Sequence, residues 1–102
     1  MSSDGTGDAT GEVRVTRDDT RSRYEGRIGD TLVAVADFHL LGNAVVITHT
    51  GTEPEWRGQG VAGQLTRQAL DDIRASGRRV QPVCPYTQHY IEEHPAYADL
   101  LA

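Results

Sequence analysis

The pattern of this chain changes at Glu53-Pro54-Glu55-Trp56-Arg57-Gly58-Gln59-Gly60-Val61-Ala62-Gly63. Before this stretch the apolar residues follow strand-like patterns, and after it they recur at the spacing of a helix. Glycine lets a backbone approach a ligand closely, and the start of a helix leaves several N–H groups without partners. A glycine-rich connection between a strand and a helix is therefore a candidate anion-binding site.

Four strands are predicted before the glycine-rich stretch. They cover residues 13–16, 21–28, 31–41 and 44–50. Turn-forming pairs such as Gly29-Asp30 and Gly42-Asn43 separate them, which predicts an antiparallel meander. The fourth segment is nearly all apolar, so we expect a central strand that is buried on both faces.

The chain after the glycine-rich stretch alternates between helix and strand. Val61, Leu65, Ala69 and Ile73 recur every four residues, which predicts an amphipathic helix on the sheet, ended by Gly77. A short strand over 78–84, a helix over 87–94 and a last helical turn over 97–101 follow. The prediction is a mixed α/β (α+β) fold, with a mostly antiparallel sheet of about five strands. The main helix follows the fourth strand, and a short helix lies near the C-terminus.

Length and charge restrict the class of protein further. With 102 residues, the chain predicts a single domain over residues 12–102 and, because residues 1–11 are poor in apolar side chains, a disordered tail. A net charge of -5 argues against nucleic acid or a membrane surface as partner, since both require a basic face. No apolar run approaches the roughly 20 residues of a membrane span. The only cysteine can form no internal disulfide, which favours the cytoplasm.

Glycine-rich stretches of this kind bind several phosphate ligands. A Walker A loop is excluded because it needs a lysine and the chain has none. Gly58, Gly60 and Gly63 do spell the dinucleotide fingerprint, but that fingerprint belongs to the first βαβ unit of a parallel sheet. A loop for the pyrophosphate of coenzyme A remains, as does a helix start whose glycines serve only close packing. The glycines alone leave both interpretations open.

At Arg57, Gly60 and Ala62 the chain resembles the GCN5-related N-acetyltransferases, whose signature is Arg/Gln-x-x-Gly-x-Gly/Ala. More of the chain is similar to a minimal group of that family, the YjdJ-type predicted acetyltransferases. The segments that carry this likeness are Ile47-Thr48-His49-Thr50, Val80-Gln81-Pro82-Val83-Cys84-Pro85-Tyr86 and Tyr90-Ile91-Glu92-Glu93-His94-Pro95-Ala96-Tyr97. The resemblance covers about residues 24–101.

The resemblance implies that acetyl-CoA binds as co-substrate where the fourth and fifth strands separate. It assigns the pyrophosphate to the backbone of Arg57, Gly58, Gln59, Gly60, Val61, Ala62 and Gly63, and the pantetheine arm to Thr52, Glu53 and Pro54. Members of the small group often carry glutamate two residues after the strand histidine, where this chain has Gly51. If that acid serves as a base elsewhere, another group must do so here.

Three side chains are candidates for the chemistry of acetyl transfer. Cys84 is placed to protonate a departing thiolate or to act as a nucleophile, and its alternative role is that of a small buried side chain. His49 is placed to accept the amine proton, or is a hydrogen-bonded histidine at a strand end. Tyr90 stands where larger relatives often place a tyrosine acid, or packs between helices. No metal is expected, because the histidines are not spaced for a shared site.

The sequence therefore predicts an acetyl-CoA-dependent N-acetyltransferase that acts on a primary amine, either a small molecule or a protein lysine or N-terminus. The alternative is a non-catalytic acyl-CoA-binding or interaction module on the same fold, and a third class is a nucleotide-binding fragment. We expect a monomer or a weak homodimer, the latter through a truncated edge of the sheet. The acceptor is not identified by the sequence.

Overall fold

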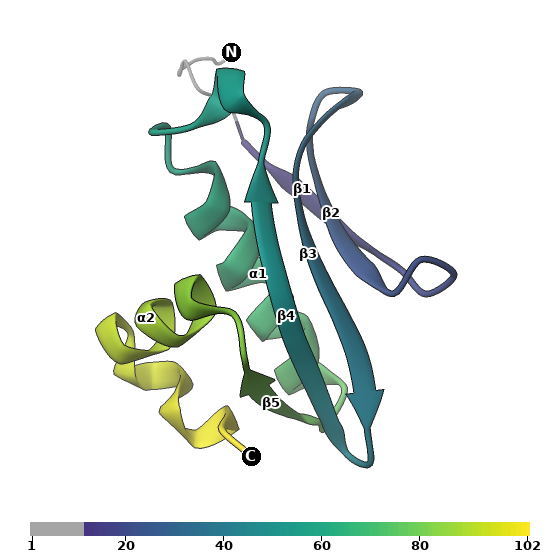
Figure 1. The fold of residues 1–102 in the computed structure, drawn as a ribbon, viewed down its shortest axis with the longest axis vertical. Coiled ribbons are helices and arrows are strands. Elements are labelled where there is room, and N and C mark those ends of the chain that lie inside the picture. Colours follow the sequence, from purple (N-terminus) through teal and green to yellow (C-terminus); the bar gives the residue numbers. More distant parts are fainter. Residues whose placement is uncertain (1–11) are drawn as a thin grey trace.

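The computed structural model describes residues 12–102, and the tail expected over 1–11 lies outside the described residues. The elements are β1 (Arg14–Asp18), β2 (Arg23–Ile28), β3 (Thr31–Leu41), β4 (Ala44–Thr52), η2 (Pro54–Trp56), α1 (Val61–Ala75), β5 (Arg79–Pro82), α2 (Pro85–Glu93) and η3 (Pro95–Leu100). They form a five-stranded sheet in the order β1-β2-β3-β4-β5 (Figure 1). The first four strands pair antiparallel, and β5 runs parallel to β4. The predicted mixed fold is confirmed, with its main helix after the fourth strand and a short helix near the C-terminus.

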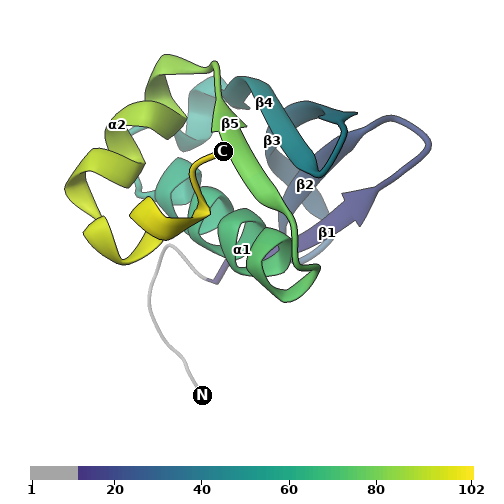
Figure 2. The ribbon, with the colours of Figure 1, turned by 90° about the horizontal axis from the view of Figure 1, so that it is seen from below.

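Helix α1 packs on one face of the sheet through the predicted apolar stripe. Val61, Leu65, Ala69 and Ile73 are all at most 1% exposed and belong to the main core cluster. Figure 2 shows α1 along one side of the sheet, with α2 and η3 beyond β5. Among the described residues no helix lies over the opposite side, which we call the open face.

Strand β4 is irregular at its centre, where β3 and β4 shift register. Asp37 pairs with His49 but Phe38 pairs with Ile47, which leaves Thr48 as an extra residue on β4. Such a bulge bends the strand and interrupts its pairing. Val45, Val46 and Ile47 are buried as expected of a central strand, but Thr48 and His49 are exposed. Burial on both faces therefore holds only for the first half of β4.

The pairing of β4 with β5 ends at Ile47, opposite Pro82. The Ile47 carbonyl accepts hydrogen bonds from both the Val83 and the Cys84 amides, at 3.0 and 2.9 Å. The strand expected over 78–84 is thus shorter, because the chain turns away after Pro82 into α2, which begins at Pro85 rather than at residue 87. Strand β4 continues to Thr52 with β3 as its paired strand. A gap opens between the second half of β4 and the start of α2.

The outer edge of β5 is occupied within the chain itself. The Val80 carbonyl accepts from the Ala102 amide at 2.9 Å, and the Pro82 carbonyl accepts from the Gln88 side-chain amide at 3.1 Å. Pro82 also has no N–H to offer. A second copy could pair along this edge only by displacing these bonds, so the homodimer stays a prediction without support from this edge.

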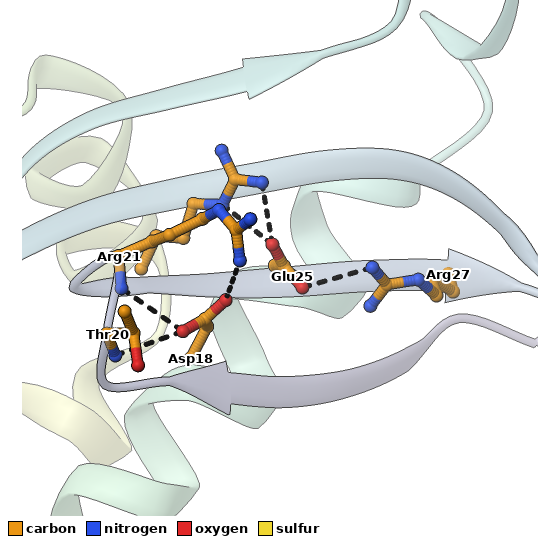
Figure 3. Close-up of polar contacts among 6 residues, drawn as sticks. Asp18, Thr20, Arg21, Glu25 and Arg27 are labelled. Atoms are coloured by element: carbon orange, nitrogen blue, oxygen red, sulfur yellow. Dashed lines mark hydrogen bonds and ion pairs between the residues drawn. The ribbon is translucent and has the colours of Figure 1, made fainter.

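On the open face, the carboxylate of Glu25 lies between two arginines (Figure 3). Glu25 is 6% exposed, and its oxygens lie 2.7 Å from Arg23 Nη2 and 3.1 Å from Arg27 Nη2. The hydrogen bond from Arg23 lowers the pKa of Glu25, burial opposes this, and Arg27 lowers the pKa further. The net effect is a pKa below the ordinary glutamate value, so the ionised form is favoured by folding.

Replacing this carboxylate tests its contribution to the pH dependence of stability. Because its pKa is lower in the folded state, Glu25 stabilises the fold above its unfolded pKa and loses that contribution as pH falls through the folded pKa. We expect Glu25→Gln to lower the free energy of unfolding at pH 7 by about 1 kcal/mol. Urea titrations from pH 7 to pH 3 should show a flatter acid dependence for the variant.

The control is Asp30→Asn, which removes the same charge from an exposed turn. If Asp30→Asn and Glu25→Gln changed the acid dependence equally, the arginine pair would have no specific role at Glu25.

Candidate functional site

A pocket of about 230 Å³ lies at the start of α1. It is lined by Thr52, Trp56, Arg57, Gly58, Gly60, Val61, Ala62, Gly63 and Tyr86. Seven of these are residues for which the sequence predicted cofactor binding; the other three so predicted, Glu53, Pro54 and Gln59, are outside the lining. The lining includes one arginine and no acidic residue, although the chain as a whole has a net charge of -5. This local composition suits an anion.

The loop before α1 depends on glycine for its conformation. Gly58 and Gly60 have φ values of 78° and 76°, in the region that side chains disfavour. A Cβ at either position would meet nothing within 4 Å, so conformation rather than crowding requires glycine. Both positions therefore leave open space above the backbone, where a ligand can approach.

The first amides of α1 face the pocket without partners from the described side chains. The Gly60 carbonyl accepts from the Gln64 amide at 3.1 Å, which is the first bond of the helix. The N–H groups of Val61, Ala62 and Gly63 precede that bond, and Gly60 provides no side-chain cap. They lie at the positive end of the helix dipole. The start of α1 thus presents several donors to a negatively charged group.

The gap beside β4 extends from this pocket. The Glu53 amide donates to the Val33 carbonyl of β3 at 2.8 Å, and backbone groups alternate in direction along an antiparallel strand. The backbone groups of Thr50 and Thr52 consequently point away from β3, to the side where β5 has diverged. Thr52 also lines the pocket, so the pocket lies at the end of this unpaired side of β4.

Cys84 lies at the other end of the gap, directly before α2. It is 5% exposed, and its Sγ donates to Thr50 Oγ1 at 3.6 Å. Burial raises the pKa of the Cys84 thiol, but hydrogen bonds from the Thr87 amide and the Thr50 hydroxyl lower it, and the net shift is downward. Cys84 thus lies beside Thr50 in the second half of β4, and its role in the chemistry stays a prediction.

His49 lies on the opposite face of β4 from Cys84. Thr50 pairs with Ala36, a buried residue of the core, whereas His49 pairs with Asp37 and is exposed. Successive strand residues point to opposite faces, so His49 points to the open face. The sequence predicted that His49 and Cys84 lie on the same side of the sheet. The structure places them on opposite faces of β4.

The imidazole of His49 leans over Gly51. A Cβ built on Gly51 would lie 3.1 Å from His49 Nε2, closer than ordinary contact. The missing side chain at position 51 therefore leaves room for the histidine, at the point where β4 borders the gap. This is the position for which the family resemblance implies a glutamate in other members.

Tyr90 packs between helical elements rather than along the pocket. Its ring stacks on His94 with centroids 3.9 Å apart and lies 6.2 Å from the ring of Tyr97. The tyrosine that lines the pocket is Tyr86, one helical turn earlier on α2. Tyr86 and Trp56 line the pocket but were not among the predicted site residues. The available signal was the four-residue spacing of Tyr86 and Tyr90, which puts both on one side of a helix starting at Pro85.

Across residues 12–102, no group of three or more His, Cys, Asp or Glu side chains is arranged to hold a metal ion. In the same part of the chain, no helix has the length and apolar character needed to cross a membrane.

The fold and the site together define an acetyltransferase-like protein. A family model described as GCN5-related N-acetyl-transferase matches residues 23–100, and the chain belongs to that family. It is similar to Protein NATD1 of Mus musculus, with 31% identity over 87 residues, 83% of this chain and 79% of that protein. Protein NATD1 of Homo sapiens is 31% identical over 85 residues, covering 81% of this chain and 75% of that protein.

Solved structures share the fold at lower identity. A GCN5-like protein of Staphylococcus aureus, solved by NMR in solution, superposes with a TM-score of 0.67 at 20% identity, covering 87% of each chain. The ribosomal-protein-S18-alanine N-acetyltransferase of Escherichia coli gives a TM-score of 0.60 at 12% identity, over 70% of this chain and 49% of that one. These similarities support the GCN5-related fold, and the YjdJ-type subgroup stays a prediction.

The hydrogen bond between Cys84 and Thr50 gives a direct test of the thiol environment. We expect Thr50→Val to raise the pKa of Cys84. The hydrogen bond with Thr50 lowers this pKa and burial raises it, so removing the hydrogen bond leaves the effect of burial less opposed. The pH dependence of alkylation by iodoacetamide measures this, with a midpoint at higher pH in the variant. Thr52→Val, the next residue on the same face, is the control. A midpoint that moves equally in both variants, or in neither, would contradict the assignment.

Proposed function

We propose that the protein is an acetyl-CoA-dependent N-acetyltransferase that transfers an acetyl group to a primary amine. The observation that carries this proposal is the arrangement of three features along β4: an acid-free pocket that includes Thr52, a second half of the strand without β5 as partner, and the Cys84 thiol bonded to Thr50. Family membership supplies the reaction class.

The residues present fit acetyl-CoA at each of its parts. The amides of Val61, Ala62 and Gly63, together with Arg57, suit its pyrophosphate. The backbone groups of Thr50 and Thr52 suit the amides of the pantetheine arm, which need donors and acceptors in turn. The acetyl thioester, which is the activated group the co-substrate supplies, would then lie toward Cys84.

Acetyl transfer needs a neutral amine, a polarised carbonyl and a proton for the departing thiolate. We assign the proton donor to Cys84, because its thiol lies beside the gap and has a pKa below the ordinary value. The backbone N–H of Thr50 points into the gap and is placed to polarise a carbonyl. The role of base falls to His49, whose imidazole is exposed at the border of the gap, above Gly51.

The two faces of β4 then have separate tasks. Helix α1 and the core occupy the face of Thr50 and Cys84, so the co-substrate enters from the pocket at the end of the sheet. The acceptor amine approaches from the open face, where His49 is exposed. The absence of a side chain at Gly51 keeps that approach short. Gly51 also motivates the alternative, an acyl-CoA-binding module without turnover, because no carboxylate stands there as a base.

Placing a charge in the pocket tests the binding site. Gly63 is helical, and a Cβ there would be 3.7 Å from Tyr86 Oη, an ordinary contact, so substitution at this position is compatible with folding. We expect Gly63→Glu to weaken acetyl-CoA binding roughly 100-fold through repulsion of the pyrophosphate. Calorimetric titration measures the affinity, and thermal melting verifies that the variant folds.

Gly63→Gln is the matched control, since it has the size of glutamate without the charge, and it should bind more tightly than Gly63→Glu. Equal affinity of the wild type and Gly63→Glu for acetyl-CoA would rule out this pocket as the site.

Removing the proposed acid and base tests catalysis separately from binding. We expect His49→Gln and Cys84→Ala each to keep the affinity for acetyl-CoA and to lose about 100-fold or more in turnover, as general acid and base groups do. Turnover is measured as free thiol released over a panel of primary amines, next to calorimetric titration of the same proteins.

His39→Gln, which changes an exposed histidine elsewhere on the sheet, should leave turnover unchanged. Undiminished turnover of Cys84→Ala would remove Cys84 from the mechanism. If the wild-type protein bound acetyl-CoA without turning over any amine of the panel, the binding module would replace the enzyme as the proposed function.

A further inference from the structure

Helix α1 contacts α2 and η3 along the side that carries Gly63, Arg67 and Asp71, which we call the seam. These three residues mark successive levels, one helical turn apart. At the first level, Tyr86 Oη lies 3.7 Å from where a Cβ on Gly63 would be. Arg67 and Asp71 follow at four-residue intervals on the same side of α1. At the third level, Asp71 accepts a hydrogen bond from Tyr97 at 2.7 Å, which joins α1 to η3. The seam begins at the pocket and leads away from it along α1.

Arg67 occupies the middle level without an ion-pair partner among residues 12–102, and it is exposed. Its place in the seam follows from the spacing on α1, four residues after Gly63 and four before Asp71. Burial raises the pKa of Tyr90, and the charge of Arg67 opposes that rise; the same charge acts on Tyr97. By contrast, Arg74, about two turns farther along α1, is held by Asp99 at 2.8 and 3.0 Å. Arg67 therefore keeps its guanidinium available to a ligand.

Tyr86 presents an aromatic ring at the rim of the pocket. It lines the pocket and is 39% exposed, although it is a large apolar side chain. An exposed ring beside a site for phosphate suits a planar base, because every nucleobase can stack on an aromatic face. Tyr86 on α2 and Arg67 on α1 offer a ring and a cation on adjacent levels, and the four residues of α1 from Gly63 to Arg67 span about 6 Å along its axis.

The pocket is too small to hold the nucleoside part of an acyl carrier such as acetyl-CoA as well as its pyrophosphate. A volume of about 230 Å³ accommodates a diphosphate, whereas whole ligands of larger size occupy sites of roughly 300–1,000 Å³. The nucleoside must therefore lie on a surface next to the pocket. On the side of η2 that surface includes the exposed carboxylates of Glu53 and Glu55, which repel a phosphate. On the side of the seam it includes the ring of Tyr86 and the cation of Arg67, and the carboxylates there, Asp71 and Glu93, contact Tyr97 and His89.

We infer that Tyr86 and Arg67 bind the nucleotide end of the acyl carrier, the ring of Tyr86 stacking on the base and the guanidinium of Arg67 pairing with the phosphate on the ribose. This inference rests on the proposed function and deepens it. Its consequence is selectivity among carriers with the same thioester. Coenzyme A has a phosphate on its ribose, dephospho-coenzyme A lacks it, and acetylpantetheine lacks the whole nucleotide.

The test compares acetyl-CoA with acetyl-dephospho-CoA by calorimetric titration of the wild type and of Arg67→Gln. We expect the wild type to favour acetyl-CoA about tenfold, the ratio that corresponds to a charge-assisted contact of about 1.4 kcal/mol. In Arg67→Gln the two affinities should become equal within about twofold, while the affinity for acetyl-dephospho-CoA stays at the wild-type level.

Arg14→Gln is the matched control, because it removes the same charge from an exposed arginine on β1, the strand at the other edge of the sheet. It should preserve the wild-type preference. Tyr86→Leu should weaken both nucleotide-bearing carriers and leave acetylpantetheine unchanged, which separates stacking on the base from contacts with the arm.

An unchanged preference for acetyl-CoA in Arg67→Gln would overturn the inference and leave the proposed function intact. So would a loss of preference of equal size in Arg14→Gln, since the effect would then be one of net charge. Failure of the wild type to bind any of the three thioesters would instead contradict the proposed function itself.

Discussion

The architecture of the site depends on the carbonyl of Ile47, which takes hydrogen bonds from two successive amides, those of Val83 and Cys84. A carbonyl shared in this way ends the parallel ladder, because the next residue of β5 has no further partner on β4. Pro82 contributes by lacking an N–H, and Pro85 contributes by starting α2 at once. The second half of β4 is consequently left with free backbone groups on one side. The gap, the half-buried Thr50 and Thr52 beside it, and the position of Cys84 all follow from this divergence.

The alternation of side chains along β4 then divides the chemistry between two faces. Thr50 and Cys84 belong to the side that α1 covers, and His49 belongs to the open face. In the proposed function, the divergence of β5 lets a thioester beside β4 be reached from both sides, with the co-substrate at the end of the sheet and the acceptor on the open face. On the open face, Glu25 forms ion pairs with Arg23 and Arg27.

Much of the fold could be predicted from the sequence. The spacing of apolar residues indicates which side of a helix or strand is buried, and turn-forming residue pairs indicate hairpins. The stripe of Val61, Leu65, Ala69 and Ile73 packs as expected, and the glycine-rich stretch leads into α1. The relation between Cys84 and His49 could not be predicted, because it depends on the bulge at Thr48 and on strand alternation, which only the observed register fixes. Tyr86 was missed because its contact with Gly63 joins two helices whose packing no local pattern specifies. Pro82 and Pro85 indicated that β5 ends early. The two hydrogen bonds that the Ile47 carbonyl accepts could not be predicted.

An acidic chain can hold an anion site because its arginines are unequally engaged. In the described part of the chain, Arg17, Arg21, Arg23, Arg27 and Arg74 are held by carboxylates. Arg57, which lines the pocket, and Arg67, one turn after Gly63 on α1, form no such pairs. Paired charges cancel at short range, so the field near the pocket is set by the two free guanidinium groups and by the amides of α1. Net charge describes only the sum over the whole chain. The local arrangement decides which small anion the protein can bind.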